Sequence, residues 1–431
     1  MLAVDQGLPD VTADRGKPLK ICLLGYRSNP YSGGQGIYIR YLSKALVDAG
    51  HTVEVISGEP YPDLDERVSL IKLPGLNLFE AENHVTALRA RHLLSYTDFI
   101  EWFSMLTGGF PEPYTFGRRL VKHFRQHKPG YDVIHDNQSL CYGVLTLQRM
   151  GLPVVTTIHH PITSDLRIAL QSAEDWKHRL LIRRWHSFLR MQKNVVGRLD
   201  HLVTVSEASR RDIATDFNIH ASKLTIVPNG IDTRIFRPMP HIEREPLTIM
   251  ATASADAPLK GLDYLLKAVA SLVSEFPGLR LMVLGKLKSD GATAKLIDRL
   301  GIVDRITFYS GVSPEDIANL YAKATCAVVP SVYEGFGLPA GEAMACGVPL
   351  VSTNGGALPE VVGDSGLIVP VRDHQAIAQA LRTLLSDPLL RQSLGERGRQ
   401  RILEKFSWDV AARDMVNVYR NVLHQVTGEA A

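Results

Sequence analysis

Short apolar runs alternate with helical stretches along almost the whole chain, and this alternation constrains the fold more than any other feature. One series of runs lies at residues 19–25, 52–58, 131–137, 152–160 and 201–207, and a second lies at 247–254, 279–286, 305–311, 326–331 and 348–353. Strand-length apolar runs separated by helices predict parallel sheets with helices on both faces. The fold class is therefore α/β.

Two such series predict two Rossmann-like domains, and a length of 431 residues also favours two cores over one. The series meet at a proline-rich, charged stretch, "FRPMPHIEREP". We expect a flexible N-terminal tail at 1–17, a first domain at 18–236, a linker at 237–246 and a second domain at 247–410. Residues 74–117 are less regular, and the sequence predicts little there beyond a helix or loop excursion.

The composition excludes several classes of protein. A net charge of +3 lacks the basic excess of a nucleic-acid-binding protein. The four cysteines form no CxxC pair, which argues against a metal or disulfide framework and fits a reducing compartment. The first 17 residues contain no apolar signal core, and no apolar run reaches 18 residues. We therefore expect a cytoplasmic protein.

Ligands of open parallel sheets bind beyond the carboxyl ends of the strands, so the segments after strands matter most. Gly33 and Gly34, in "SGGQG", precede a helix that begins near Ile37, where backbone amides can approach an anion. A glycine pair before a helix is also a common turn, and the GxGxxG fingerprint is absent. The "TTIHH" run ends a strand with histidines that can hydrogen-bond a sugar hydroxyl, although an ordinary loop histidine fits equally.

Lys260, in "APLKG", opens a helix after the strand at 247–254. A lysine beside a helix N-terminus suits phosphate as a point charge. Surface lysines are common, so this position alone does not indicate a site.

Glu334 and Glu342 stand eight positions apart in a glycine-rich segment that follows the strand at 326–331. We expect Glu334 in a loop and Glu342 one turn into a short helix that Gly347 ends. Backbone amides near the glycines can reach a diphosphate, and a carboxylate in the helix can accept two hydrogen bonds from a ribose diol. The alternative is a capped helix with one buried ion pair.

The segment "PSVYEGFGLPAGEAMACGVPLVSTNGGALPEVVGDSGLIVP" (330–370) closely resembles the EX7E signature of the family 4 retaining glycosyltransferases. The resemblance extends from about residue 19 to 425 and includes "GGQG", "VVTTIHH", "VSEASRRDI", "VPNGIDTRIFRP" and "LKGLDYLLKA". It implies the GT-B fold, in which two facing Rossmann-like domains hold the donor in the cleft between them. The first domain would then bind the acceptor and the second the nucleotide sugar, and a last helix at about 411–428 would pack back on the first domain.

The resemblance also implies roles for single residues. Glu342 matches the glutamate that holds the nucleotide ribose, and Glu334 the one near the donor sugar. His159, rather than His160, matches the family's catalytic-site histidine, and Lys260 matches its phosphate lysine. The remaining matches are donor-binding positions: Gly33 and Gly34 in the loop that closes over phosphate, Phe336, Gly337 and Leu338 around the diphosphate and sugar, and Val312 beside the base.

One position departs from the family pattern. An arginine usually precedes the lysine and clamps the diphosphate with it, whereas this chain has Ser254 or Ala255 there. Lysine does not reproduce the bidentate contact of a guanidinium. Three alternatives remain. Lys286, after "LMVLG", or Ser254 itself supplies a compensating phosphate contact; the leaving group is held more weakly; or the donor differs from the usual one.

The function implied is retaining transfer of a sugar from a nucleotide-diphosphate donor to a hydroxyl of a saccharide or lipid-linked acceptor. The departing phosphate would take the acceptor proton, and no metal or other cofactor would be required; we interpret the "DLD" at 63–65 as a turn. A glycosidase would leave the phosphate elements unexplained, and an epimerase or phosphorylase of the same architecture should lack the EX7E block. The main alternative is a degenerate, non-catalytic protein that binds nucleotide or glycan as a partner subunit.

Residues 176–200 form a basic segment with apolar side chains near one side of a predicted helix. Such a helix can lie on an anionic membrane surface, which would suit a lipid-linked acceptor and a peripheral location at the inner face of a membrane. The alternative is an apolar stripe that packs on the domain.

Overall fold

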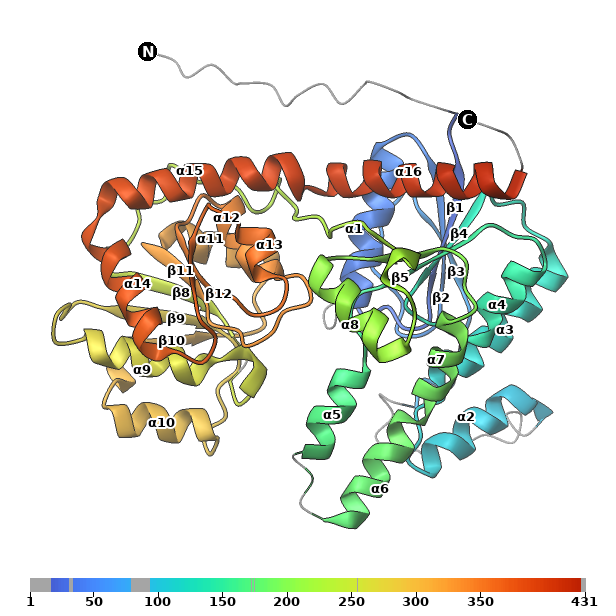
Figure 1. Cartoon of the computed structure of the whole chain (residues 1–431), viewed down its shortest axis with the longest axis horizontal. Coiled ribbons are helices and arrows are strands. Elements are labelled where there is room, and N and C mark those ends of the chain that lie inside the picture. The colour runs from blue at the N-terminus through green and yellow to red at the C-terminus, as the bar shows by residue number, and fades with distance from the viewer. Residues whose placement is uncertain are drawn as a thin grey trace.

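The computed structural model describes residues 17–30, 34–78, 94–171, 173, 175–253 and 255–427. Of the predicted N-terminal tail, only Lys17 belongs to these residues. Two α/β halves lie side by side, each built on its own sheet, and two long C-terminal helices run along both of them (Figure 1). The prediction of an α/β chain with two Rossmann-like domains is confirmed.

The first half contains a seven-stranded parallel sheet in the order β3-β2-β1-β4-β5-β6-β7. Its strands are β1 (Lys20–Gly25), β2 (Thr52–Ser57), β3 (Ser69–Lys72), β4 (Val133–Asn137), β5 (Val154–Ile158), β6 (Leu202–Thr204) and β7 (Leu224–Ile226). Its helices are α1 (Gly34–Asp48), α2 (Tyr96–Leu106), α3 (Glu112–His127), α4 (Tyr142–Arg149), α5 (Thr163–Gln171), α6 (Trp176–Trp185), α7 (Leu189–Val196) and α8 (Glu207–Phe217).

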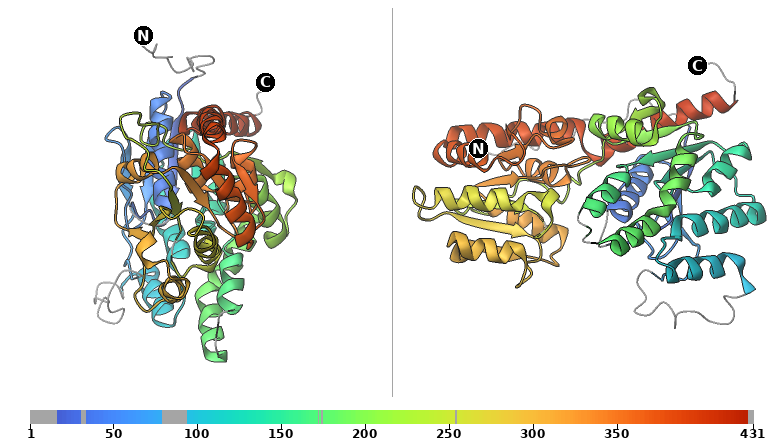
Figure 2. Two further views of the ribbon diagram at one scale, coloured as in Figure 1. Left: turned by 90° about the vertical axis from the view of Figure 1, so that its left-hand side faces the viewer. Right: turned by 60° about the horizontal axis from the view of Figure 1, so that its bottom comes forward.

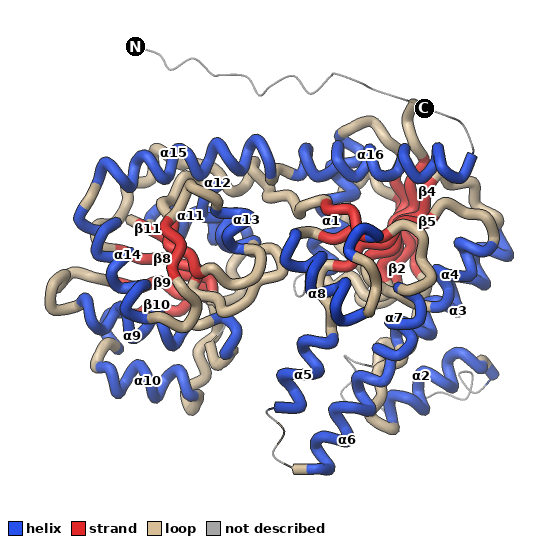
Figure 3. Tube along the Cα trace, in the orientation of Figure 1, coloured by secondary structure: helices blue, strands red, loops and turns tan. Residues whose placement is uncertain are grey.

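The second half contains a six-stranded parallel sheet in the order β10-β9-β8-β11-β12-β13. Its strands are β8 (Thr248–Thr252), β9 (Arg280–Leu284), β10 (Ile306–Tyr309), β11 (Cys326–Val329), β12 (Leu350–Thr353) and β13 (Leu367–Val369). The helices that follow are α9 (Leu262–Leu272), α10 (Ala292–Leu300), α11 (Pro314–Lys323), α12 (Leu338–Ala345), α13 (Leu358–Val362), α14 (His374–Ser386), α15 (Pro388–Lys405) and α16 (Trp408–Thr427). Figure 3 shows how the helices enclose the two groups of strands.

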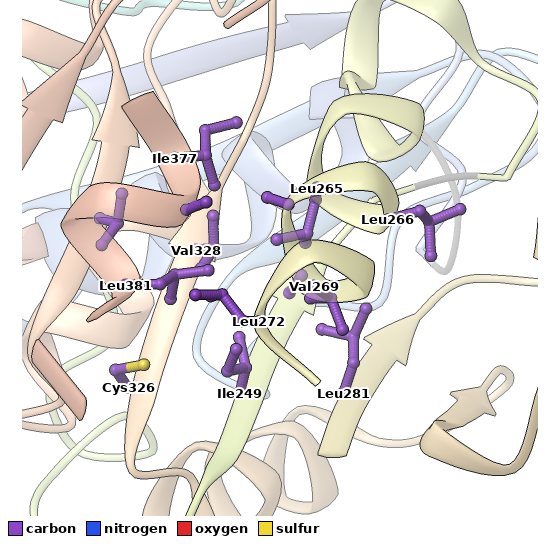
Figure 4. Packing of buried hydrophobic residues seen from close by; sticks show 14 of the residues in the cluster. Ile249, Leu265, Leu266, Val269, Leu272, Leu281, Cys326, Val328, Ile377 and Leu381 are labelled. Atoms are coloured by element: carbon purple, nitrogen blue, oxygen red, sulfur yellow. The ribbon is translucent and has the colours of Figure 1, made fainter. Parts of the chain in front are cut away.

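Each sheet is apolar on both faces because helices cover both. On one face of the second sheet, Ile249 and Val328 pack against Leu265 and Val269 of α9 and Leu381 of α14 (Figure 4). Burying side chains of this size contributes about 1.5–3 kcal/mol each, so these faces fix the helices on the sheet. The loops at the strand ends are then held at defined positions.

The last helix joins the two halves. α15 belongs to the second half, while α16 buries Trp408, Met415 and Tyr419 in the core of the first half. The Tyr419 hydroxyl is 2.6 Å from Nδ1 of the buried His135 in β4. The helix begins at Trp408, three residues before the start that we expect from the resemblance.

The prediction of one helix at 176–200 is wrong. The segment forms α6, a 3-10 turn at His186–Phe188 and then α7. α7 buries apolar side chains in the first half, whereas α6 projects away from it and leaves Trp176 70% exposed (Figure 2).

Within residues 74–117, the structure places α2 and the start of α3, while 79–93 lie outside the described residues. No helix in the described part of the chain is long and apolar enough to cross a bilayer.

Candidate active site

The carboxyl ends of the two sheets meet where His159, which follows β5, lies beside Gly335, which follows β11, with Ser209 bridging them. The Ser209 hydroxyl, on α8, lies 3.1 Å from the carbonyl oxygen of His159 and 3.0 Å from that of Gly335. Ser206, the N-cap of α8, donates to the Gly335 carbonyl at 2.8 Å. A Cβ at position 335 would lie 3.4 Å from the His159 carbonyl, an ordinary van der Waals distance, so the two backbones lie close together here.

Lys260 and Glu334 form an ion pair at this edge, with 2.8 Å between Nζ and Oε1. Gly261 permits this approach because its φ is +63° and a Cβ there would lie 2.0 Å from the Pro330 carbonyl oxygen. The two loops are also joined by the amide of Val332, which donates to the Leu259 carbonyl at 2.8 Å. Lys260 ends a 3-10 turn that precedes α9, rather than opening the helix as we predict from the sequence.

Gly355 and Gly356 support the loop that carries Glu334. A Cβ at Gly356, whose φ is +61°, would lie 2.2 Å from the Glu334 carbonyl oxygen, and one at Gly355 would lie 2.6 Å from that of Val332. The amide of Ala357 donates to the Glu334 carbonyl at 2.9 Å. The "NGG" segment after β12 therefore fixes the position of the Glu334 backbone.

Glu342 lies one turn into α12, where the sequence predicts it. Gly337 begins this helix with φ +103° and no side-chain cap, and Leu338 is its first residue. Burial raises the pKa of Glu342 to about 7. Burial raises the pKa of Tyr41 on α1 to about 12, and the charges of Asp232 and Glu342 contribute a smaller part. Glu342 is therefore close enough to the first half to act on it electrostatically.

Phe336 turns into the core rather than toward the strand ends. Its side chain is 5% exposed and packs edge-on against Phe406 with 5.9 Å between ring centroids. Only its backbone is available to a ligand.

His159 is a neutral histidine held in one orientation. Its Nε2 is 2.8 Å from Oδ1 of Asn137, and because Nδ2 of Asn137 donates to the Gln35 carbonyl at 3.0 Å, Oδ1 accepts and Nε2 carries the proton. Burial, with smaller contributions from His160 and His135, lowers the pKa of His159 to about 3. Nδ1 is then an acceptor. His160 is exposed.

The other predicted positions are more scattered. Val312 follows β10 and is half-buried, while Lys286 follows β9, is exposed and forms no ion pair with a described residue. Gly34 is the first residue of α1, with open space where a Cβ would stand. Gly33 and Ser254 lie outside the described residues.

Sequence reasoning missed the residues that hold the two halves together. Glu360, on α13, accepts from the amides of Glu207 (2.7 Å) and Ala208 (2.8 Å) at the N-terminus of α8. Sequence reasoning also missed Gln138, which orders the loop after β5 within the first half: Gln138, with φ +54°, accepts from the amide of His159 at 2.7 Å and donates to the His160 carbonyl at 2.8 Å. The "VSEAS" and "ALPE" segments belong to the family resemblance, but no pattern in them indicates a contact between halves.

Comparisons with known proteins agree with this arrangement. A family model described as Glycosyltransferase Family 4 matches residues 32–235, and one described as Glycosyl transferases group 1 matches residues 235–401. The chain is 44% identical over 413 residues to the MMP alpha-(1->4)-mannosyltransferase of Mycolicibacterium hassiacum, covering 95% of this chain and 99% of the relative. A D-inositol 3-phosphate glycosyltransferase of Kribbella flavida is 27% identical over 421 residues, covering 92% and 93%.

Solved structures share the fold. Sucrose-phosphate synthase from Thermosynechococcus elongatus superimposes with a TM-score of 0.67 at 24% identity, over 94% of this chain and 100% of that one. HepE of Anabaena in complex with UDP gives 0.67 at 17% identity, over 94% and 100%. The prediction of a glycosyltransferase enzyme is confirmed by the family models and the 44% identical mannosyltransferase. The chain is a glycosyltransferase with the GT-B fold and belongs to the family 4 glycosyltransferases.

Proposed function

We propose that this enzyme transfers a mannosyl residue from a nucleotide-diphosphate sugar to a hydroxyl of a saccharide or lipid-linked acceptor, with retention of configuration and without a metal ion. The observation that carries the proposal is the meeting of His159, Glu334 and Lys260 at the carboxyl ends of the two sheets, beside the His159–Gly335 contact. The sugar is inferred from the 44% identical relative, which is named as a mannosyltransferase.

Lys260 and the N-terminus of α12 are suited to the diphosphate. The lysine is 36% exposed, and the helix begins at Gly337 without a side-chain cap. Pro339 has no N–H and the Ala340 amide donates to the Gly337 carbonyl at 3.0 Å, so the amides of Gly337 and Leu338 are the ones suited to an anion. Positive charge from these groups stabilises the leaving phosphate as the bond to the sugar breaks.

Glu342 and His159 are suited to hydroxyl groups. The Glu342 carboxylate can accept from both hydroxyls of a ribose diol, while the unprotonated Nδ1 of His159 accepts from a sugar hydroxyl. Glu334, held by Lys260 and by the Ser331 hydroxyl at 2.8 Å, is placed to face the sugar that the diphosphate carries.

In the transfer step, the bond between the sugar's C1 and the phosphate oxygen breaks, and the acceptor oxygen bonds to C1 on the same face. The acceptor proton passes to the departing phosphate oxygen, so no carboxylate nucleophile is required. The relative's name specifies an α linkage, which means retention where the donor's bond to phosphate is also α.

We further propose that α6 contacts an anionic membrane surface. Leu180 and Leu181 are 59% and 58% exposed beside the exposed Trp176, and Lys177, Arg179 and Arg183 lie on the same helix. Exposed aromatic and aliphatic side chains with basic neighbours favour binding to the headgroup region of an anionic bilayer.

The test is a donor panel of uridine, guanosine and adenosine diphosphate mannose and glucose, followed by release of the nucleoside diphosphate. One mannose donor should be turned over, and Lys260→Ala should lose most of that activity, because Ser254 or Ala255 stands where an arginine usually shares the diphosphate with this lysine. If Lys260→Ala turns over as fast as the wild type, the diphosphate site lies elsewhere. If only glucose donors react, the assignment of mannose is wrong.

A further inference from the structure

The second half contains an open pocket of about 510 Å³ at the edge of its sheet opposite the active site. Thr325 and Pro349, which line it, come directly before β11 and β12, at their amino ends. The active-site loops follow the carboxyl ends of the same strands. The pocket is therefore separated from the donor site by the length of the sheet.

Three arginines from two segments line this pocket: Arg244 from the segment between the sheets, and Arg391 and Arg399 from α15. Each caps carbonyl groups at the end of a helix. Arg244 donates to the carbonyls of Ala324 (2.6 Å) and Gly347 (3.0 Å).

Arg391 donates through Nη1 to the carbonyls of Leu384 (2.6 Å) and Leu385 (3.0 Å), and Arg399 donates through Nη1 to those of Phe236 and Ala345 (both 3.0 Å). No ion pair joins any of the three guanidinium groups to a carboxylate within the described ranges.

The pocket keeps an excess of positive charge. Three guanidinium charges exceed the partial charges of three helix C-termini, which amount to about half a charge each. The lining side chains include one carboxylate, Glu396, which is exposed and accepts from Gln392 at 2.9 Å. Burial lowers the pKa of Arg399 and of Arg244, which shows that neighbouring charge does not compensate for the loss of water around them.

Arg391 offers the geometry that an anion needs. Both of its hydrogen bonds to described residues use Nη1, so Nε and Nη2 form no bond to the described chain. This edge of a guanidinium presents two parallel N–H groups, the arrangement that binds phosphate or carboxylate in a bidentate manner. The pocket volume lies in the range of about 300–1,000 Å³ typical of small-molecule sites.

We propose that this pocket binds a small phosphorylated metabolite at a site separate from the donor site. The ligand would lie between Arg391 and Arg244, so it would contact both segments of chain that connect the two halves: the stretch before β8 and α15, which leads into α16.

Calorimetry with pyrophosphate as the probe, at low ionic strength, tests the proposal. The decisive variants change exposed residues that cap no carbonyl. Glu396→Gln removes the lining carboxylate and should tighten pyrophosphate binding about three- to tenfold, while Gln392→Glu should weaken it by a similar factor. Glu404→Gln is the matched control, because Glu404 accepts from Gln400 at 2.6 Å on the same helix but does not line the pocket. The pyrophosphate affinity of this variant should stay within about twofold of the wild-type value.

Arg391→Gln should cost at least about tenfold in pyrophosphate affinity through the loss of a charged hydrogen bond. Lys260→Ala should leave this affinity unchanged, since pyrophosphate at the donor site is a separate binding event. The proposal is overturned if Lys260→Ala removes all binding while Gln392→Glu leaves it unaltered. It is also overturned if Glu404→Gln tightens binding as much as Glu396→Gln, because the effect would then be one of net charge alone.

Discussion

The ion pair between Lys260 and Glu334 should compete with the nucleotide, so Glu334→Gln should tighten the binding of a nucleoside diphosphate. Lys260 Nζ lies 2.8 Å from Glu334 Oε1, and the side chains are 36% and 13% exposed. A charged hydrogen bond contributes about 1.5–3 kcal/mol, but exposed pairs contribute at most about 1 kcal/mol. Because Lys260 is more than a third exposed, we expect a gain of about 0.5–1.5 kcal/mol, or about two- to twelvefold in Kd.

Turnover should change in the opposite direction. A contact to the donor sugar that strengthens in the transition state appears in kcat, so Glu334→Gln should lower kcat by at least about tenfold while product binding improves. Calorimetry of the nucleoside diphosphate and steady-state release assays separate the two effects.

Ser331→Ala is the matched control for this experiment. It removes the hydroxyl that donates to the same Oε1 at 2.8 Å but leaves the charge, so it should not tighten nucleotide binding. Weaker binding in Glu334→Gln would mean that Glu334 itself holds the nucleotide. Unchanged binding would mean that Lys260 does not contact the diphosphate.

Three further outcomes are expected. Burial raises the pKa of Glu342 to about 7, and a bound ribose favours the ionised carboxylate, so donor affinity should rise with pH between about 5 and 8. The rise should reach up to tenfold for each unit by which binding lowers this pKa, and Glu342→Gln should remove it. Calorimetry with an intact nucleotide sugar measures the effect, because the diphosphate of that donor does not titrate in this range. Turnover should survive EDTA in the release assay, and loss of activity that manganese restores would exclude the metal-free mechanism. Vesicles that contain anionic lipid should carry the protein into the pellet on sedimentation. The double variant Trp176→Ser, Leu180→Ser should reduce the bound fraction at least about threefold. Equal binding of wild type and variant would show that α6 does not contact the bilayer.

The sheets could be predicted from the sequence wherever a strand is buried on both faces. β4 and β11 are buried along their whole length; β11 is a continuous apolar run, whereas β4 begins with two apolar residues and ends in the polar residues His135, Asp136 and Asn137. β3, β7 and β13 were not predicted. Each is an edge strand; β3 has no fully buried residue, and β7 and β13 have one each, so none has the two-sided burial that marks the central strands.

The error at 176–200 has a different cause. Apolar spacing is close to helical throughout, but Arg184 donates to the Ser104 hydroxyl (3.1 Å) and to the Thr107 hydroxyl (2.9 Å), beside the end of α2. This contact spans about 80 residues of chain, and the 3-10 turn follows directly after it. Periodicity describes one helix at a time and contains no information about such a contact.

Some active-site positions could likewise be predicted from local sequence, and others could not. The positions of Lys260, Glu334 and Glu342 after their strands follow from local pattern, since glycines and strand ends are visible in the sequence. The contacts that bring His159 to Gly335 link Ser209 to a residue 126 positions away. Nothing local to Ser209 indicates that partner.

The two helix N-termini near this contact differ in what they offer an anion. At α8, the amides of Glu207 and Ala208 already donate to the carboxylate of Glu360. Its N-cap hydroxyl, on Ser206, accepts from the amide of Ser209 as well, so this helix end has its anion from the protein itself. At α12, Gly337 provides no side-chain cap, Pro339 has no N–H and the Ala340 amide donates to the Gly337 carbonyl, while no carboxylate of the described residues accepts from the amides of Gly337 and Leu338. An anion at the carboxyl edge of the sheets is therefore favoured at α12, the helix that also holds Glu342, and the positive end of that helix acts where the leaving phosphate would develop charge.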